Sequence, residues 1–276
     1  MKPLIDGDIL VYEAASSAEV GWKSDGPAPW DYVESLLELS MMNICASVRA
    51  TEAPLVFLST DKNFRYQLAK TKPYKGNRKD IIRPFHYDNI RAWMPMRWET
   101  IICDGYEADD GLAMYQTQAE ENTTIICSRD KDLRQVPGWH YTWGRGGQVA
   151  EGPTLVEEFG HIRLYERIVM PISPDKKAYK AYKLRGDGLK FFYAQCLMGD
   201  VVDNIPGCKG VADKGAFELL SECNSEEECH KVVLDAYNNI WGENGKDVLL
   251  EQARLLWLVR GRNDDETLTM WEHPKY

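Results

Sequence analysis

Four short apolar segments constrain the fold of this chain more than any other sequence feature, because each is followed at once by acidic residues. They are residues 3–5, 55–58, 100–103 and 124–127. Such runs predict buried strands. Helical patterns lie between them, for example over residues 30–48 and 109–121. Strands that alternate with helices predict a parallel sheet with right-handed crossovers. The acids should then meet at one edge of that sheet, where open α/β sheets bind ligands.

The acids predicted to gather at this edge are Asp6, Asp61, Glu107, Asp109, Asp110, Asp130 and Asp132. A single acid after a strand is usually a turn residue or a helix cap. A whole group would repel one another and raise their own pKa values unless cations neutralised them. Oxygen ligands suit Mg²⁺ or Mn²⁺. Asp8, two residues after Asp6, is either a further ligand or a cap.

Helical patterns dominate the chain after residue 186, over residues 189–198, 216–221, 226–240 and 247–260. We therefore expect an α/β core over residues 1–185, with a twisted, mostly parallel sheet and flanking helices, and a helical C-terminal region over residues 186–276. In the latter, Asp200 and Asp203 lie three residues apart, on one helical face. Gly207 opens a glycine-punctuated turn into a helix, whose N–H groups can hold a phosphate.

The charge distribution is uneven. The net charge of -10 by itself argues against a nucleic-acid partner. Lys and Arg nevertheless concentrate over residues 62–91 and 175–190, the second segment with interleaved tyrosines. These basic segments could contact phosphates, although charge alone favours a solvated face or a flexible loop.

Cysteine usage and hydropathy predict an intracellular, cytoplasmic protein. The seven cysteines form no Cys-x-x-Cys pair, which indicates reduced thiols rather than disulfides or a zinc site. No apolar run is long enough to cross a bilayer, so we expect no membrane partner. Asp6 and Asp8 interrupt any signal-peptide core at the N-terminus.

Four motifs occur in order along residues 4–220: Tyr74–Arg78, Glu107–Asp110, Ser128–Leu133 and Gly199–Gly207. Together they resemble the flap-endonuclease-like 5′→3′ nucleases, and most of all the 5′→3′ exonucleases of tailed phages. The resemblance implies a PIN-like 5′-nuclease core, a helix–two-turn–helix DNA-binding element and hydrolysis of phosphodiester bonds from 5′ ends of duplex DNA. For a phage-encoded chain, the location would be the host-cell cytoplasm.

The resemblance also implies a role for each matching residue. Asp6, Asp61, Glu107, Asp109 and Asp110 would serve a first metal ion, Asp132, Asp200 and Asp203 a second, and Asp130 would lie between the two. The ions would be two Mg²⁺ or Mn²⁺, with K⁺ at the 207–214 turn. Lys75 and Arg78 would act with Asp130 in catalysis by contacting the scissile phosphate. The DNA-binding residues would be Arg65, Tyr74, Lys75, Arg78, Gly207, Lys209, Gly210 and Lys214.

Several alternatives remain open at this point. The DNA partner could be a duplex with a 5′ end, a flap or a gap, and RNA–DNA hybrids could also be cut. A structure-specific 5′ flap endonuclease is the first alternative. A non-catalytic DNA-binding protein of the same fold is the second, although every expected acid is present. A PIN-like ribonuclease is disfavoured by the motif over residues 199–207. Tyr74 either stacks on an end base or packs half-buried.

Overall fold

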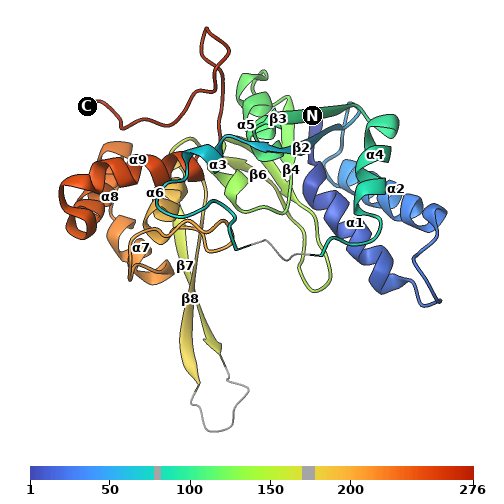
Figure 1. Ribbon diagram of the computed structural model, residues 1–276, viewed down its shortest axis with the longest axis horizontal. Coiled ribbons are helices and arrows are strands. Elements are labelled where there is room, and N and C mark those ends of the chain that lie inside the picture. The colour runs from blue at the N-terminus through green and yellow to red at the C-terminus, as the bar shows by residue number, and fades with distance from the viewer. Residues whose placement is uncertain (78–81, 170–177) are drawn as a thin grey trace. The chain divides into compact units, whose positions relative to one another are not determined.

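The computed structural model describes residues 1–77, 82–169 and 178–276, and these form two compact units (Figure 1). Unit 1 comprises Met1–Phe64, Arg78–Val156 and Leu258–Thr269. Unit 2 comprises Arg65–Asn77, Glu157–Trp257 and Met270–Tyr276. Each unit has its own buried apolar core.

Unit 1 is built on a six-stranded sheet in the order β3-β2-β1-β4-β5-β6. The strands are β1 (Lys2–Asp6), β2 (Leu55–Asn63), β3 (Thr100–Gly105), β4 (Thr124–Cys127), β5 (Gly138–Thr142) and β6 (Glu151–Val156). All neighbours are parallel except the pair β5 and β6, which is antiparallel. The four strands expected from the sequence are confirmed, and so is the mostly parallel sheet.

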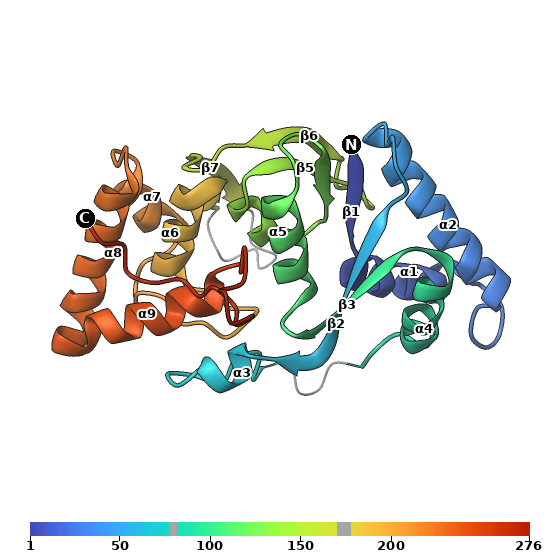
Figure 2. The ribbon, with the colours of Figure 1, turned by 90° about the horizontal axis from the view of Figure 1, so that it is seen from above.

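Helices cover both faces of this sheet (Figure 2). They are α1 (Gly7–Gly21), α2 (Trp30–Ser47) and α4 (Tyr87–Arg97) on one face, and α5 (Ala108–Gln118) on the other. The alternation of side chains along the strands explains this division. Ile5 and Val56 belong to the core under α1 and α2, whereas their neighbours Leu4 and Phe57 belong to the core under α5.

Unit 2 packs helices beside a two-stranded hairpin. The elements are α3 (Arg65–Leu68), β7 (Ile162–Val169), β8 (Tyr179–Gly186), α6 (Gly188–Met198), α7 (Asp213–Leu220), α8 (Glu226–Trp241) and α9 (Gly245–Leu256). Short 3₁₀ turns occur at Asp132–Gln135 in unit 1 and at Gly242–Asn244 in unit 2. Helix α6 is apolar on nearly all sides and forms the centre of the core of unit 2.

The compact units differ from the division at residues 185 and 186 expected from the sequence. Hairpin β7–β8 lies with the helices of unit 2, because Ile162 and Leu184 are buried in the core around α6. Residues 65–77 also belong to unit 2, and residues 258–269 return to unit 1. The sequence prediction used charge and helical periodicity, and these local patterns do not indicate which distant segments pack together.

All seven cysteines are free, and six are buried. Burial raises the pKa of the Cys103, Cys208 and Cys229 thiols to about 12, so they stay protonated near neutral pH. This confirms the expectation of reduced thiols. Among the described residues, no helix has both the length and the apolar character needed to cross a membrane.

Candidate metal centre

Asp6 stands at the point where β1 passes directly into α1. Its Oδ1 accepts a hydrogen bond from the Ile9 N–H at 3.1 Å, so Asp6 is the N-cap of α1. The next residue must be small, since a Cβ atom on Gly7 would lie 2.5 Å from the Phe57 carbonyl oxygen. The Asp6 side chain is thereby held at the carboxyl end of β1, with only 1% of the residue exposed.

A serine hydroxyl connects Asp6 to the segment after β4. Ser128 Oγ donates to Asp6 Oδ2 at 2.5 Å and accepts from the Asp130 N–H at 2.9 Å. Asp130 Oδ1 in turn accepts from the Asp132 N–H at 2.8 Å. The sheet therefore brings Asp6 and Asp130 to one edge, as the sequence predicted.

The electrostatics of this edge are unfavourable for two carboxylates. Burial and, to a smaller extent, the nearby Asp8 charge raise the pKa of Asp6 to about 7. Burial also raises the pKa of Asp130 to about 7, with contributions from the charges of Asp132 and Asp6. A divalent cation would offset the repulsion and keep both groups ionised near neutral pH. This property of the donor set fits a bound metal ion.

Asp110, at the start of α5, binds backbone groups with both carboxylate oxygens. Its Oδ2 accepts from the Glu107 N–H at 3.1 Å, as part of a capping box with Glu107. Its Oδ1 accepts from the Val259 N–H at 2.9 Å, and the residue is fully buried. Asp110 thus anchors residues 258–269 to α5. This structural role stands beside its predicted role as a ligand.

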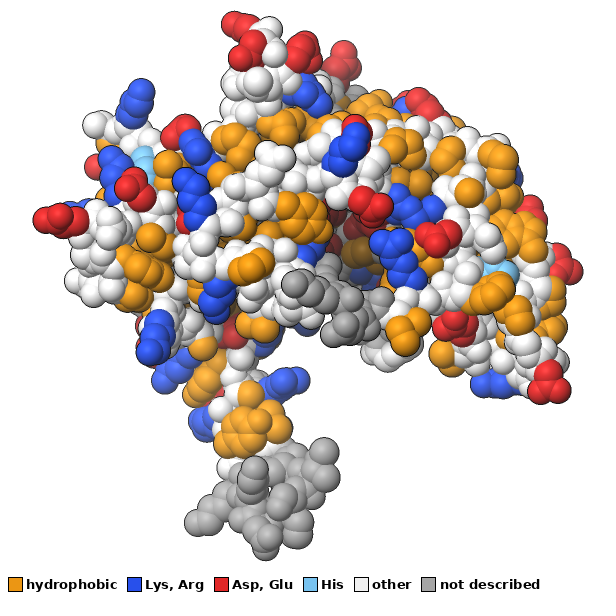
Figure 3. Space-filling model, in the orientation of Figure 1, with side chains coloured by type: hydrophobic (Ala, Val, Ile, Leu, Met, Phe, Trp, Pro, Cys, Tyr) orange, Lys and Arg blue, Asp and Glu red, His pale blue; other side chains and the backbone are white. Residues whose placement is uncertain are grey.

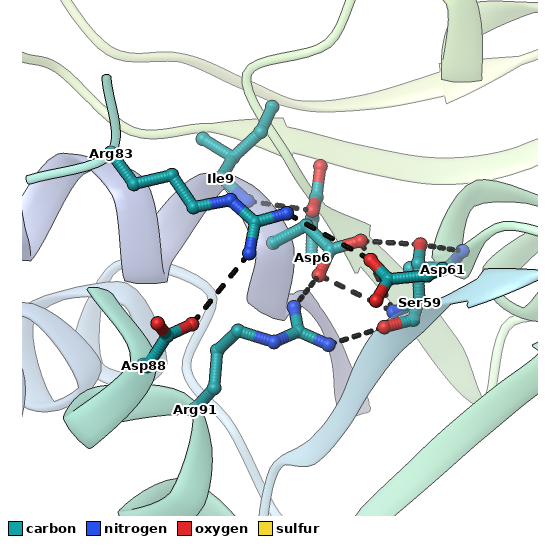
Figure 4. A network of polar contacts seen from close by, with 9 residues as sticks. Asp6, Ile9, Ser59, Asp61, Arg83, Asp88 and Arg91 are labelled. Carbon is teal, nitrogen blue, oxygen red and sulfur yellow. Dashed lines mark hydrogen bonds and ion pairs between the residues drawn. The ribbon is translucent and has the colours of Figure 1, made fainter. Parts of the chain in front are cut away.

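A second network joins Asp8 to Ser59 of β2 and Arg91 of α4, and Figure 4 shows Ser59 and Arg91 side by side. Asp8 accepts from the Ser59 N–H and hydroxyl and forms an ion pair with Arg91 at 2.6 Å. The Ser59 Oγ accepts from the Ala108 N–H at 2.8 Å, which fixes the start of α5. Asp8 is therefore not the helix cap, a role that Asp6 fills.

Asp61 points into solvent, with its side chain fully exposed. Its carboxylate lies 3.8 Å from the Arg83 guanidinium, which also lies 3.7 Å from Asp88 and stacks on Tyr87 (Figure 4). Within residues 1–77, 82–169 and 178–276, no three His, Cys, Asp or Glu side chains already lie together in a metal-binding arrangement. Backbone and side-chain partners hold several of the predicted ligands instead.

In unit 2, the predicted ligands Asp200 and Asp203 share a tight turn. Asp200 Oδ1 accepts from the Val202 N–H at 2.6 Å and from the Asp203 N–H at 3.2 Å. Asp203 accepts from the Tyr74 hydroxyl at 2.9 Å, and its carbonyl oxygen accepts from the Lys75 N–H at 2.9 Å. The loop that carries Lys75 is thus fastened to this turn.

Two predicted DNA contacts require correction. Arg65 is only 1% exposed, and its guanidinium donates to the carbonyl oxygens of Leu255 and Trp257 at 2.9 and 2.8 Å. It anchors the start of the 65–77 loop on the end of α9 and cannot reach DNA. Tyr74 is only 4% exposed and packs in the core of unit 2, so its ring offers no face to a base. Of the two alternatives for Tyr74, the structure therefore supports packing over stacking on a base.

The remaining residues predicted to contact DNA fall into three cases. Arg78 lies outside the described residues. Lys75 has a positive φ of 52° and places its ammonium 5.0 Å from the Tyr74 ring centre. The 207–214 turn begins at Gly207, which has a φ of 62° and lies against Gly199 so closely that a Cβ would meet the Gly199 nitrogen at 2.2 Å. In the turn, Gly210 also has a positive φ and Lys209 is exposed. Lys214, in the first turn of α7, lies over Tyr182.

Sequence reasoning missed the residues that hold these acids in place. Ser59 and Ser128 occupy equivalent positions, each immediately after a buried strand segment. That repeated position is a signal that could have identified them. Arg129 forms an ion pair with Glu13, which also accepts from the Trp143 ring N–H at 2.9 Å. Glu13 carried no comparable signal, because it looks like an ordinary helical acid.

Comparisons with known proteins agree with this architecture. Residues 3–157, more than half of the chain, match the family model described as 5′-3′ exonuclease, N-terminal resolvase-like domain. The 5′-3′ exonuclease of Buchnera aphidicola subsp. Acyrthosiphon pisum is 24% identical, and the match covers 98% of this chain and 84% of the relative. DNA polymerase I of Chloroflexus aurantiacus is 28% identical over 80% of this chain. The match covers 22% of that polymerase, so the chain spans about a fifth of its length.

Two solved structures share the fold. One is a flap endonuclease of bacteriophage T5 in a pseudo-enzyme–product complex with DNA and metal ions, with a TM-score of 0.58 and 15% identity. The other is the T5 5′-exonuclease with bound zinc ions, with a TM-score of 0.56 and 15% identity. Both alignments cover 92% of this chain and 88% of the solved chain.

Proposed function

The chain belongs to the 5′-3′ exonuclease family, and from this premise we propose that it is a divalent-metal-dependent nuclease that hydrolyses DNA from 5′ ends. One observation carries the proposal. Asp6, which is buried, and Asp130, which is partly buried, lie together at the carboxyl ends of the parallel strands β1 and β4, and the pKa of each is raised to about 7. Two such groups are stable as carboxylates only with a cation beside them.

We propose that Asp6 and Asp130 hold the metal, with Asp132 and the acids at the start of α5 completing the ligand set. Mg²⁺ or Mn²⁺ suits these oxygen donors. When bound, such ions would activate the attacking water and stabilise charge on the leaving 3′-oxygen. Ser128 orients the acids, because its hydroxyl contacts both Asp6 and the Asp130 backbone. Asp200 and Asp203 stay predicted ligands of a second ion, and K⁺ at the 207–214 turn stays a prediction.

For unit 2 we propose a role in binding the DNA backbone. Lys75 has its backbone held by Asp203 and its ammonium over the Tyr74 ring, so its position is defined before substrate arrives. A preorganised cation offsets the charge that builds on the nonbridging phosphate oxygens during hydrolysis. Exposed Lys209 and the glycines of its turn can contact phosphates without reading bases. Arg78 is assigned to the same role from the sequence alone.

The experiment that tests this function compares three 5′-labelled substrates: duplex DNA, a 5′ flap and an RNA–DNA hybrid. Each is digested with and without Mg²⁺, with Asp130→Asn as the matched control. We expect metal-dependent release of short 5′ products from the duplex and from the hybrid, and no release by the variant. Metal-independent cleavage, or full activity of Asp130→Asn, would refute the metal assignment.

A 5′ flap endonuclease is the second candidate, since a solved protein of this fold is described as a flap endonuclease. Cleavage at the flap junction in preference to the duplex end would favour it. Binding of all three substrates with no cleavage in Mg²⁺ or Mn²⁺ would instead favour the non-catalytic DNA-binding protein. The cytoplasmic location likewise stays a prediction.

A further inference from the structure

We propose that one face of hairpin β7–β8 is a binding surface for the phosphate backbone of duplex DNA. The choice of DNA as the ligand rests on the proposed function, but the hairpin residues differ from those assigned above to the metal centre and to phosphate contacts. The family model ends at residue 157, before the hairpin begins, and so says nothing of the hairpin. The basic segment over residues 175–190 identified in the sequence includes all of β8.

The strand register divides the hairpin into two faces, since directly paired residues share a face and successive residues alternate. The cationic face consists of Arg163, Tyr165, Arg167, Val169, Tyr179, Ala181, Lys183 and Arg185. The anchored face consists of Ile162, Leu164, Glu166, Ile168, Lys180, Tyr182, Leu184 and Gly186. The single acid in the two strands, Glu166, lies on the anchored face, where it pairs with Lys180 at 3.0 Å.

Only the base of the hairpin is supported by a core. Ile162 and Leu184 are buried in unit 2, and Leu164 packs against the same core. Further out, Ile168 is 70% exposed and Tyr179 is 57% exposed. Figure 1 shows the strands extending away from the helices of unit 2. A two-stranded hairpin without a packed face is marginally stable in water. The outer half of β7–β8 therefore contributes little to folding, which favours a role in binding a ligand.

The charge of the cationic face identifies that ligand. Arg163 and Arg167 are exposed and pair with no acid among the described residues. Arg185 lies 5.6 Å from the Tyr165 ring centre, and Lys183 is 3.3 Å from Asp213. Lys and Arg side chains gather along the hairpin in Figure 3, although the whole chain has a net charge of -10. A cationic strip with aromatic rings complements a polyanion.

The hairpin is also continuous with the turn predicted to bind DNA. Asp213 of that turn pairs with Lys183 on the cationic face at 3.3 Å, whereas Lys214 places its ammonium 5.3 Å from the ring centre of Tyr182 on the anchored face. Each strand has eight residues, which corresponds to roughly 27 Å at about 3.4 Å per residue. That length exceeds the width of the major groove, about 12 Å. The hairpin is therefore long enough to reach across a groove of duplex DNA from one phosphate backbone to the other.

The test measures binding of a 5′-labelled duplex in EDTA, where no metal-dependent cleavage interferes. The variant Arg163→Gln/Arg167→Gln removes two charges from the cationic face. The matched control Lys180→Gln/Lys231→Gln removes two charges from the anchored face and from the exposed side of α8. We expect the arginine variant to weaken binding by roughly tenfold to a hundredfold at 0.1 M salt and to lower the salt slope by about two. The control should change affinity less than threefold.

Three results would overturn the proposal: equal effects of the arginine variant and its control, an unchanged salt slope, or a change in oligomeric state without a change in DNA affinity. The last result would indicate a protein interface instead. Unchanged circular dichroism and melting temperature verify that both variants fold. The proposed function has a separate readout, because Asp130→Asn should lose cleavage and keep duplex affinity. Failure of either proposal therefore leaves the other measurable.

Discussion

Two pairs of acids that the sequence assigns to metal ions differ in their surroundings. In unit 1, Asp6 is buried and Asp130 is partly buried, and loss of hydration raises the pKa of each to about 7. Asp200 and Asp203 in unit 2 form a turn in which Asp200 accepts two backbone N–H groups and Asp203 accepts the Tyr74 hydroxyl. The aspartates of unit 1 therefore repel each other, whereas those of unit 2 are stabilised by hydrogen bonds within a turn.

This difference indicates which acids need a bound cation to be stable in the ionised form. Removing a charge from the pair in unit 1 should relieve repulsion and raise stability without metal. Removing one from the turn in unit 2 should break hydrogen bonds and lower stability. Four predictions test this comparison, in order of decreasing effect.

The largest effect is expected for Asp130→Asn. Turnover should fall by at least about a thousandfold, because metal-ion catalysis contributes several kcal/mol. The melting temperature without metal should rise, and the increase produced by Mg²⁺ in the parent protein should disappear. Turnover and thermal denaturation with and without Mg²⁺ measure both effects. Asp203→Asn is the control for the comparison, and its metal-free melting temperature should fall.

The second largest effect is expected for Lys75→Ala. Loss of one preorganised cation costs about 2.7–4 kcal/mol of transition-state stabilisation, by analogy with loss of an oxyanion donor. We therefore expect turnover at saturating DNA to fall roughly a hundredfold to a thousandfold, while affinity changes little. Lys72→Ala, an exposed cation in the same loop, is the control. A uniform loss of affinity with normal turnover would make Lys75 a steering charge only.

The pH dependence of stability should weaken when metal is added. The folded-state pKa values of Asp6 and Asp130, about 7, lie above the ordinary value of 3.8. The folded metal-free protein therefore binds more protons than the unfolded chain between these values, and its stability falls as the pH rises from about 4 to 7. The loss should be on the order of a few kcal/mol.

Chemical denaturation at pH 5 and pH 7.5, in EDTA and in Mg²⁺, measures this dependence. Mg²⁺ should restore stability mainly at the higher pH, where the carboxylates ionise. A metal-free protein that becomes more stable over this range would show that the two acids are not the repelling pair. Asp6→Asn should flatten the profile.

The smallest effect is expected for Tyr74→Phe. The change removes the hydroxyl that donates to Asp203 and keeps the buried ring. The free energy of unfolding should fall by about 1–3 kcal/mol, since the acceptor is a carboxylate. Tyr66→Phe is the control, because Tyr66 lies beside Tyr74 but is 54% exposed. Equal effects of the two changes would show that the bond to Asp203 contributes no stability.

Local patterns predicted most of the regular structure. The four apolar runs became β1 to β4. Continuous Val, Ile and Leu suit β1, β4 and the first half of β2, which are buried on both faces, whereas the edge strand β3 leaves Ile102 49% exposed. The periodic stretch over residues 30–48 became α2, which ends at Ser47. Hairpin β7–β8 was not predicted, because its register depends on pairing between residues up to 24 positions apart, as in Ile162 and Gly186.

The sequence by itself determined the acidic edge of the sheet, because strand order in a parallel sheet places the ends of β1 and β4 side by side whatever the details of packing. Only the tertiary structure decided what each residue does there. Arg65 became an internal anchor, Asp61 an exposed acid, and Ser128 the link between Asp6 and Asp130. Burial and hydrogen-bond partners come from segments far apart in the chain, and those contacts, rather than residue type, determine which carboxylates require a cation.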